Sequence, residues 1–176
     1  MDIAVRIEAA GAGAGEAPEV EYRWDADTDI LTANVRAGAV SEGMSGSVGV
    51  EGSDGSWLIF DVASGKIRGV EVAVWPDVRK LSSLAPPEQV EDASITLPAR
   101  ASQPGIASLE MDTALVAESD QSERTIHFRI GPKRRTRVVR LAKDILLDVD
   151  QRSVIAGVWL LNVPPFPAEA HSEQAQ

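Results

Sequence analysis

The chain has 176 residues, a formal net charge of -10 and no cysteine. This length allows one or two small domains with a hydrophobic core, and the missing thiols exclude disulfides, thiolate catalysis and thiolate metal sites. Almost all of the acidic excess lies in the first 100 residues, which disfavours nucleic acid as a partner.

Short runs of β-branched and aromatic residues, separated by turn residues, predict strands along the first half of the chain. Residues 9–18 are nearly all glycine and alanine, which predicts a flexible connector. Asp77, directly after Pro76, predicts the start of one short helix near 77–84. The strands expected in this half are 2–8, 20–24, 30–36, 47–51, 57–62 and 66–74.

The second half repeats the plan of the first. The stretch 57–76, WLIFDVASGKIRGVEVAVWP, returns in altered form at 144–164, DILLDVDQRSVIAGVWLLNVP. Both copies run an apolar strand into Asp-Val, pass a polar turn, and begin a second apolar strand at Gly-Val. Upstream, 113–117 and 125–130 form a predicted hairpin, and the basic strand 136–143 takes the place of 47–51.

An alignment of the two halves connects these hairpins. If Gly38 is set on Gly131, Thr32 falls on Thr125 and Arg36 on Arg129.

A single meander buries one face only, so a second copy is expected to cover it. The sequence therefore predicts a mostly β protein, with two antiparallel β-meander repeats packed as one pseudo-symmetric sandwich or curved sheet. The four tryptophans are expected in its core or at an interface. The expected parts are an N-terminal strand and Gly/Ala segment at 1–19, a first repeat at 20–92, a linker at 93–105, a second repeat at 106–166 and a disordered tail at 167–176.

The first repeat resembles a small bacterial family, the domain of unknown function 2283. Tyr22 with the acidic turn 25–29, the apolar strand 58–61 ending in Asp, and the Gly-Val-Glu-Val finish at 69–72 carry the resemblance. It covers about half of the chain, and the second copy departs from it because Trp159 follows Gly-Val where the family has Glu. Some members are encoded beside small toxin-like proteins, so the resemblance implies a partner-binding, antitoxin-like role.

Asp61 and Asp148 stand at matching places in the two copies, each at the end of an apolar strand. One hypothesis is that the two carboxylates meet across a twofold axis and act as an acid and base pair. The alternative is that each accepts hydrogen bonds from the turn that follows it. The sequence favours the second interpretation.

A basic run at 129–143 is the one concentration of positive charge. Its candidate ligand or partner contacts are Arg129, Arg135, Arg137 and Arg140. Such a run could contact a phosphate, a nucleotide or nucleic acid. It could instead be a charged strand edge that guards against sheet aggregation or faces the acidic first half. The absence of interleaved aromatic residues favours the second role.

Other signals for chemistry are incomplete. Asp25, Asp27 and Asp29 have the spacing that opens a calcium loop, but Ile30 and Arg36 stand where Gly and Glu are needed. A solvated hairpin turn is therefore expected.

The only histidines are His127 and His171, so neither a Ser-His-Asp set nor a histidine metal cluster is indicated. The glycine-rich stretch 38–55 lacks the Lys-Ser or Lys-Thr ending of a phosphate loop.

These patterns favour a non-enzymatic protein-interaction module, with small-molecule or nucleotide binding at 129–143 as the alternative and an enzyme using Asp61 and Asp148 as a third hypothesis. No cofactor and no metal are expected. A protein partner or a homodimer is expected, and no membrane partner, because no apolar run spans a bilayer and the N-terminus does not have the pattern of a secretory signal. The expected location is the bacterial cytoplasm.

Overall fold

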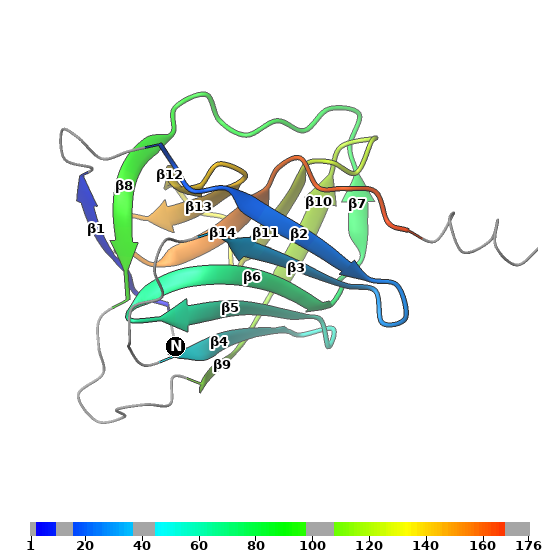
Figure 1. Cartoon of the computed structure of the whole chain (residues 1–176), viewed down its shortest axis with the longest axis horizontal. Helices are drawn as coiled ribbons and strands as arrows, with labels where there is room; N and C mark the ends of the chain where they lie inside the picture. The colour runs from blue at the N-terminus through cyan, green and yellow to red at the C-terminus, as the bar shows by residue number, and fades with distance from the viewer. Residues whose placement is uncertain (1–2, 10–15, 37–44, 98–107, 168–176) are drawn as a thin grey trace, which may run out of the picture.

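The computed structural model describes residues 3–9, 16–36, 45–97 and 108–167, and within them the protein consists of strands in two packed sheets (Figure 1). The predicted mostly β class is confirmed. No helix occurs among the described residues, and hence none there is long and apolar enough to cross a membrane.

The six-stranded sheet has the order β2-β3-β6-β5-β4-β9. All neighbours are antiparallel except β4 and β9, which are parallel. Its strands are β2 (Val20–Asp25), β3 (Ile30–Val35), β4 (Ser45–Gly52), β5 (Trp57–Ala63), β6 (Lys66–Val74) and β9 (Ser108–Thr113).

The eight-stranded sheet has the order β1-β8-β12-β13-β14-β11-β10-β7. Two of its pairs are parallel, β7 with β10 and β8 with β12. Its strands are β1 (Arg6–Ala9), β7 (Val78–Lys80), β8 (Glu91–Thr96), β10 (Leu115–Ser119), β11 (Ile126–Ile130), β12 (Thr136–Ala142), β13 (Ile145–Asp150) and β14 (Ile155–Leu160).

Five strands of each sheet follow the same order along the chain. The order β2-β3-β6-β5-β4 in one sheet corresponds to β10-β11-β14-β13-β12 in the other. The register agrees as well, because Asp61 lies opposite Gly69 and Asp148 lies opposite Gly157.

The register corrects the alignment made from sequence. Asn34 pairs with Gly69 while Arg129 pairs with Gly157, so Arg129 corresponds to Asn34 and not to Arg36. By the same offset, Thr32 corresponds to His127 and not to Thr125. A slip of two residues keeps every side chain on its face, which is why the apolar pattern alone did not detect it.

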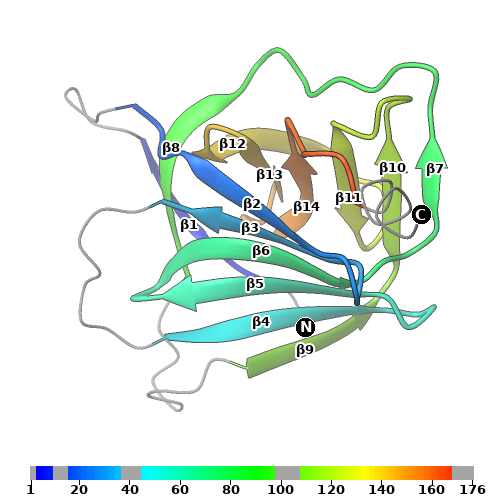
Figure 2. The same cartoon turned by 45° about the vertical axis from the view of Figure 1, so that its right-hand side comes forward.

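The two sheets are joined because strands run on from one into the other. The chain leaves β6 at Val74 and enters β7 after a short corner, and it passes from β9 to β10 at Ala114 (Figure 2). At the opposite end, the Leu97 amide donates to the Gly65 carbonyl, which ties β8 to the β5–β6 turn. The two sheets are therefore covalently continuous at one end and hydrogen-bonded at the other.

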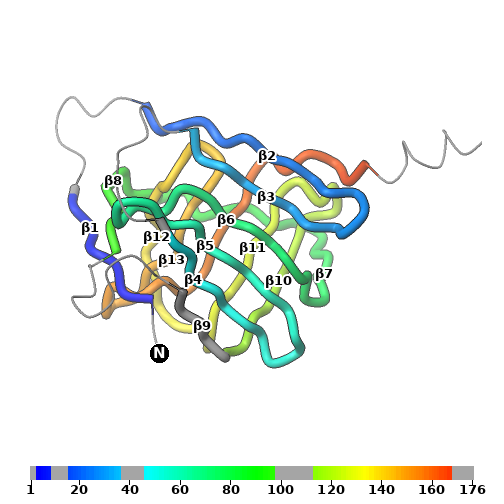
Figure 3. Tube along the Cα trace, turned by 60° about the horizontal axis from the view of Figure 1, so that its bottom comes forward, coloured from blue at the N-terminus to red at the C-terminus, as the bar shows by residue number. Residues whose placement is uncertain are grey.

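The main core fills the space between the sheets, and Figure 3 shows the six-stranded sheet lying across β11–β14. Alternate residues of the strands point into this core. In β5, for example, Leu58, Phe60 and Val62 are buried while their neighbours are only half-buried. In β13 and β14 every residue is buried. The reason is a second apolar cluster on the outer face of the eight-stranded sheet, the face turned away from the other sheet.

That second cluster explains why β13 and β14 are buried on both faces. Val138, Leu146 and Trp159 form it, and Leu84 and Val90 from the β7–β8 connection pack against it. A strand that is covered on both faces has no reason to alternate.

The helix predicted near 77–84 is wrong. Val78–Lys80 is a strand that pairs in parallel with Ala117–Ser119 of β10, because the open edge of the eight-stranded sheet satisfies the backbone that a helix would have satisfied internally. The expected linker 93–105 begins inside β8, and residues 98–107 lie outside the described part, as do most of 9–18 and the tail 168–176.

Candidate functional site

A cavity of about 420 Å³ lies at the end of the molecule where the chain crosses from β6 to β7. Its lining residues come from the end of β2, the β6–β7 corner, β7, the β10–β11 hairpin and the segment after β14. Its size falls within the range of small-molecule sites. Its lining residues are Trp24, Trp75, Val78, Ser119, Ser122, Glu123, Ile126, Pro164, Pro165 and Phe166.

Four aromatic rings form a ladder, and three of them, those of Trp24, Trp75 and Phe166, line this cavity. Phe128 is fully buried, and its ring centroid lies 5.8 Å from that of Trp75. Trp75 stacks on Trp24 at 5.6 Å with an interplanar angle of 18°, and Phe166 meets Trp24 edge-on at 5.2 Å. The ladder connects the main core to the last described segment of the chain.

Three hydrogen bonds hold the segment after β14 as a wall of the cavity. The Tyr22 hydroxyl donates to the Leu161 carbonyl at 2.7 Å, and the Trp24 indole donates to the Pro164 carbonyl at 2.9 Å. The Val163 amide donates to the Arg124 carbonyl. Burial, assisted by the nearby Asp144, raises the pKa of Tyr22, so its phenol remains a donor at physiological pH.

The polar groups of the lining are almost all engaged with other protein groups. The Trp75 indole donates to the Asp29 carbonyl at 2.7 Å, and the Ser122 hydroxyl donates to Asp120 at 2.8 Å. Glu123 forms an ion pair with Lys80 at 2.7 Å. The exception among the described lining residues is Ser119, which is fully buried and whose hydroxyl has no hydrogen-bond partner.

The structure does not bring the sequence-predicted pair Asp61 and Asp148 together. Asp61 alternates with the core residues of β5 and therefore lies on the outer face of the six-stranded sheet. Asp148 lies between Leu147 and Val149, which belong to the main core, and so faces out of the eight-stranded sheet. Both sheets separate the two carboxylates, which excludes a shared site within this chain.

Asp148 instead belongs to a local polar cluster. Its carboxylate lies 2.6 Å from His127 Nε2 and accepts a bond from the Trp159 indole at 3.1 Å. The two rings lie 4.3 Å apart. The carboxylate also lies above Gly157 on the next strand, where a Cβ atom would come within 2.5 Å of Asp148 Oδ2. The sequence motif contains both Gly157 and Asp148, but it does not predict that the two residues are in contact.

Asp61 has no such set of partners among the residues at equivalent places. The position of His127 is taken by Thr32, and that of Trp159 by Glu71, as the register shows. Burial raises the pKa of Asp61, and burial together with the charge of Asp61 raises the pKa of Glu71.

The basic run pairs mostly with acids of the first half of the chain. Arg137 lies 3.4 Å from Glu91, and Arg140 lies 3.6 Å from Asp92. Lys143, at the end of the run, bonds Glu19 at 2.5 Å. These contacts agree with one part of the role that the sequence favoured, a basic strand facing the acidic half. The other part is wrong, because β12 is not an edge strand but lies between β8 and β13.

The remaining two candidate arginines lie elsewhere in the run. Arg129 is on β11, half-buried, and its Nε donates to the Gly131 carbonyl. Arg135 precedes β12 and is exposed.

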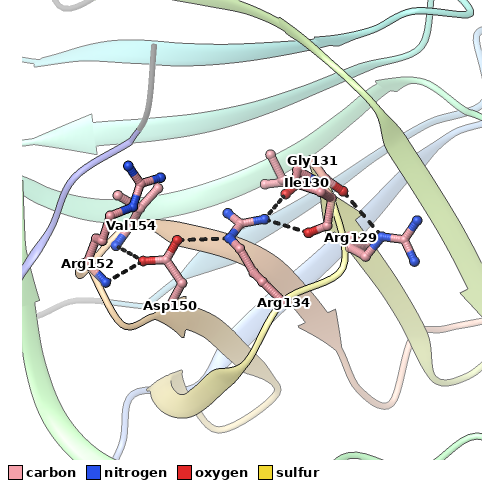
Figure 4. A network of polar contacts seen from close by, with 8 residues as sticks. Arg129, Ile130, Gly131, Arg134, Asp150, Arg152 and Val154 are labelled. Atoms are coloured by element: carbon pink, nitrogen blue, oxygen red, sulfur yellow. Dashed lines mark hydrogen bonds and ion pairs between the residues drawn. The ribbon is translucent and has the colours of Figure 1, made fainter.

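A buried carboxylate that the sequence did not single out organises the neighbouring turn (Figure 4). Asp150 accepts bonds from Arg134 Nε at 2.8 Å and from the amides of Arg152 and Val154. Burial alone would raise the pKa of Asp150, but the bond from Arg134 and the two amides outweigh it and lower the pKa. This network fixes the β13–β14 turn and the start of β12.

Asp25, Asp27 and Asp29 form the β2–β3 turn, as expected, and all three are exposed. Asp25 Oδ1 accepts the Asp27 amide, and the backbone of Asp29 has a positive φ of 60°.

Comparison of the chain with protein-family models and with curated proteins finds no match. The resemblance described above therefore stays a prediction. The aromatic cavity was not predicted from sequence, because Trp24, Trp75 and Phe166 are distant in the chain and only tertiary packing assembles them.

Proposed function

We propose that this protein is a non-enzymatic binding protein that takes a small molecule into the cavity beside Trp24 and Trp75. The observation that carries this proposal is an aromatic-walled cavity of about 420 Å³ with one buried hydroxyl among its lining residues. Cavities of this size and composition are the usual form of small-molecule sites. Among the residues that the structure describes, the lining includes no histidine or lysine and its one carboxylate is paired, which favours binding without chemistry.

Nuclear magnetic resonance of the four tryptophan indole N–H groups tests the proposal. Trp24 and Trp75 line the cavity, whereas Trp57 and Trp159 do not, so they are internal controls. A panel of small aromatic and aliphatic compounds is expected to include members that shift the first two signals in a saturable way and leave the other two in place. A panel that moves all four signals equally, or none, would contradict the proposal.

A pair of variants sharpens the test. Val78 lines the cavity and is 37% exposed, while Val74 is 47% exposed and does not line it. Val78→Trp is expected to fill the cavity and abolish the shifts at little cost in stability. Val74→Trp adds the same bulk outside the cavity and is expected to leave binding unchanged.

A second candidate function is docking of a protein partner at this end of the molecule. Val74 and Val78 are the large apolar side chains most exposed among the described residues, and they flank the Trp75 corner. This surface and the predicted antitoxin-like role favour a partner, and a second copy of the chain is one to test. Isolation of the tagged protein from its native cytoplasm should recover a stoichiometric partner that Val74→Asp releases, and light scattering should detect a homodimer.

The common strand order of the two halves supports an origin by tandem duplication. After duplication the two copies would have diverged on their outer faces. Thr32 and Glu71 in one copy stand where His127 and Trp159 stand in the other, and among the described residues an apolar connection covers the second copy alone.

A further inference from the structure

Among the described lining residues, one side chain has a hydrogen-bonding group without a partner. Both indole N–H groups of the lining are used, by the carbonyls of Pro164 and Asp29. The Ser122 hydroxyl donates to Asp120, and Glu123 is paired with Lys80. Ser119 alone, among the described lining residues, has a buried hydroxyl without a partner.

The position of Ser119 directs this group inward. Strand alternation places it on the same face of β10 as Leu115 and Ala117, which are buried between the sheets. Ser122 and Glu123 are exposed and stand at the mouth, while Ser119 and Ile126 are buried and mark the inner end. A buried hydroxyl without a partner destabilises the protein, so a ligand that hydrogen-bonds to it is bound in preference to one that cannot.

The charge of the described lining disfavours ionic ligands. Within the described part of the chain, Glu123 is the only charged side chain of the lining, and it forms an ion pair with Lys80 at 2.7 Å. A charged molecule would lose its hydration without finding an unpaired opposite charge. The remaining walls are aromatic rings, aliphatic side chains and prolines, which favour the face of a flat apolar molecule.

We infer that the ligand of this cavity is a flat, uncharged molecule with a single hydrogen-bonding substituent, and that the Ser119 hydroxyl binds that substituent. This inference rests on the proposed small-molecule function. It makes Ser119 the residue that determines specificity in the site, while Trp24, Trp75 and Phe166 supply most of the contact area.

Four probes that share one methylated ring test the inference. Toluene has no polar group, p-cresol adds a hydroxyl, and p-toluate and 4-methylbenzylamine carry opposite charges at neutral pH. Binding is measured on the full chain by titrating the Trp24 and Trp75 indole signals. We expect p-cresol to bind about two- to tenfold more tightly than toluene, the range that one neutral hydrogen bond supplies, and both charged probes to bind about tenfold more weakly than p-cresol.

Ser119→Ala separates the hydroxyl from the rest of the cavity. We expect the variant to bind toluene as the wild type does and to lose the preference for p-cresol. Its folding is checked by the unchanged Trp57 and Trp159 signals. The comparison within the wild type decides the question if this variant does not fold.

The outcomes distinguish the two proposals. If no probe and no compound of the wider panel binds, the proposed function fails. If toluene and p-cresol bind equally well to the wild type, or if a charged probe binds best, the cavity is a binding site but the ligand class inferred here is wrong. A Ser119→Ala variant that weakens toluene and p-cresol alike would assign Ser119 a purely structural role.

Discussion

Two glycines at equivalent places in the two sheets differ in how closely atoms of the neighbouring strands approach them. Gly157 and Gly69 occupy equivalent places, each opposite an aspartate. A Cβ at Gly157 would lie 2.5 Å from Asp148 Oδ2 and 2.7 Å from the Phe128 carbonyl, whereas at Gly69 the nearest atom would be the Ala33 carbonyl at 3.1 Å. The space for a side chain is therefore smaller at Gly157 than at Gly69.

This difference predicts unequal effects of one substitution. Gly157→Ala should lower the free energy of unfolding by about 1–3 kcal/mol, because the backbone and the Asp148 carboxylate must move. Gly69→Ala should cost less than about 1 kcal/mol, since the smaller overlap is partly offset by a less flexible unfolded chain. Urea denaturation measures both, and equal losses would contradict the contact described at Gly157.

The pH dependence of stability should differ between two aspartates. Burial raises the pKa of Asp61 above its ordinary value of 3.8, so the folded state holds the proton more tightly than the unfolded state. The contribution of Asp61 to stability is thus greatest below pH 3.8 and is lost as the pH rises through the folded pKa. Asp61→Asn should match the wild type at low pH, exceed its stability at pH 7, and relieve the repulsion on Glu71.

Asp54 is the matched control of opposite sign. Hydrogen bonds from the Ser56 side chain and amide lower the pKa of Asp54. Its contribution is present above the ordinary pKa and is lost as the pH falls through the folded value. Asp54→Asn should therefore reduce stability at pH 7 and have little effect in acid. Urea denaturation across this pH range checks both variants, and a loss of stability in Asp61→Asn at neutral pH would sink the account.

At the scale of elements, the β7–β8 connection acts as a cover for the eight-stranded sheet. Leu84 and Val90 pack against Val138, Leu146 and Trp159. No regular secondary structure holds this connection between β7 and β8, so apolar contact is its main tie to the sheet. The fully buried strands β13 and β14 depend on it.

Leu84→Ala tests this role. We expect a loss of about 1–2 kcal/mol in the free energy of unfolding, less than for a fully buried leucine because Leu84 is half-buried. The Trp159 indole N–H should exchange with solvent faster. Glu88→Ala, an exposed site in the same connection, should change neither quantity. Unaltered exchange at Trp159 in Leu84→Ala would show that the connection does not seal the sheet.

At the scale of the whole molecule, the two halves of the chain share both sheets. The first half contributes β1, β7 and β8 to the eight-stranded sheet, and the second half contributes β9 to the six-stranded sheet. The main core contains residues of both sheets in one cluster. Separate unfolding of the two sheets would break the continuous strands at both crossings.

We therefore expect a single unfolding transition. Trp57 reports on the six-stranded sheet and Trp159 on the eight-stranded sheet, so each of two variants that retain only one of these tryptophans, with the others changed to Phe, should show a single fluorescence transition in urea. Circular dichroism should give the same midpoint. Two separate midpoints would indicate that each sheet is stable alone.

The sequence by itself determined most strand positions and the two hairpins at 57–76 and 144–164, because alternation and turn residues are local signals. It favoured, without determining it, a basic strand that faces the acidic half. It could not determine β7, whose backbone is satisfied by a distant strand edge, nor the direction in which Asp61 and Asp148 point relative to each other. The two-residue slip between the halves also escaped it, since an even shift preserves the alternation. Only the tertiary structure decided the cavity, because Trp24, Trp75, Ser119 and Phe166 come from four separate elements and their approach depends on how two sheets close at one end.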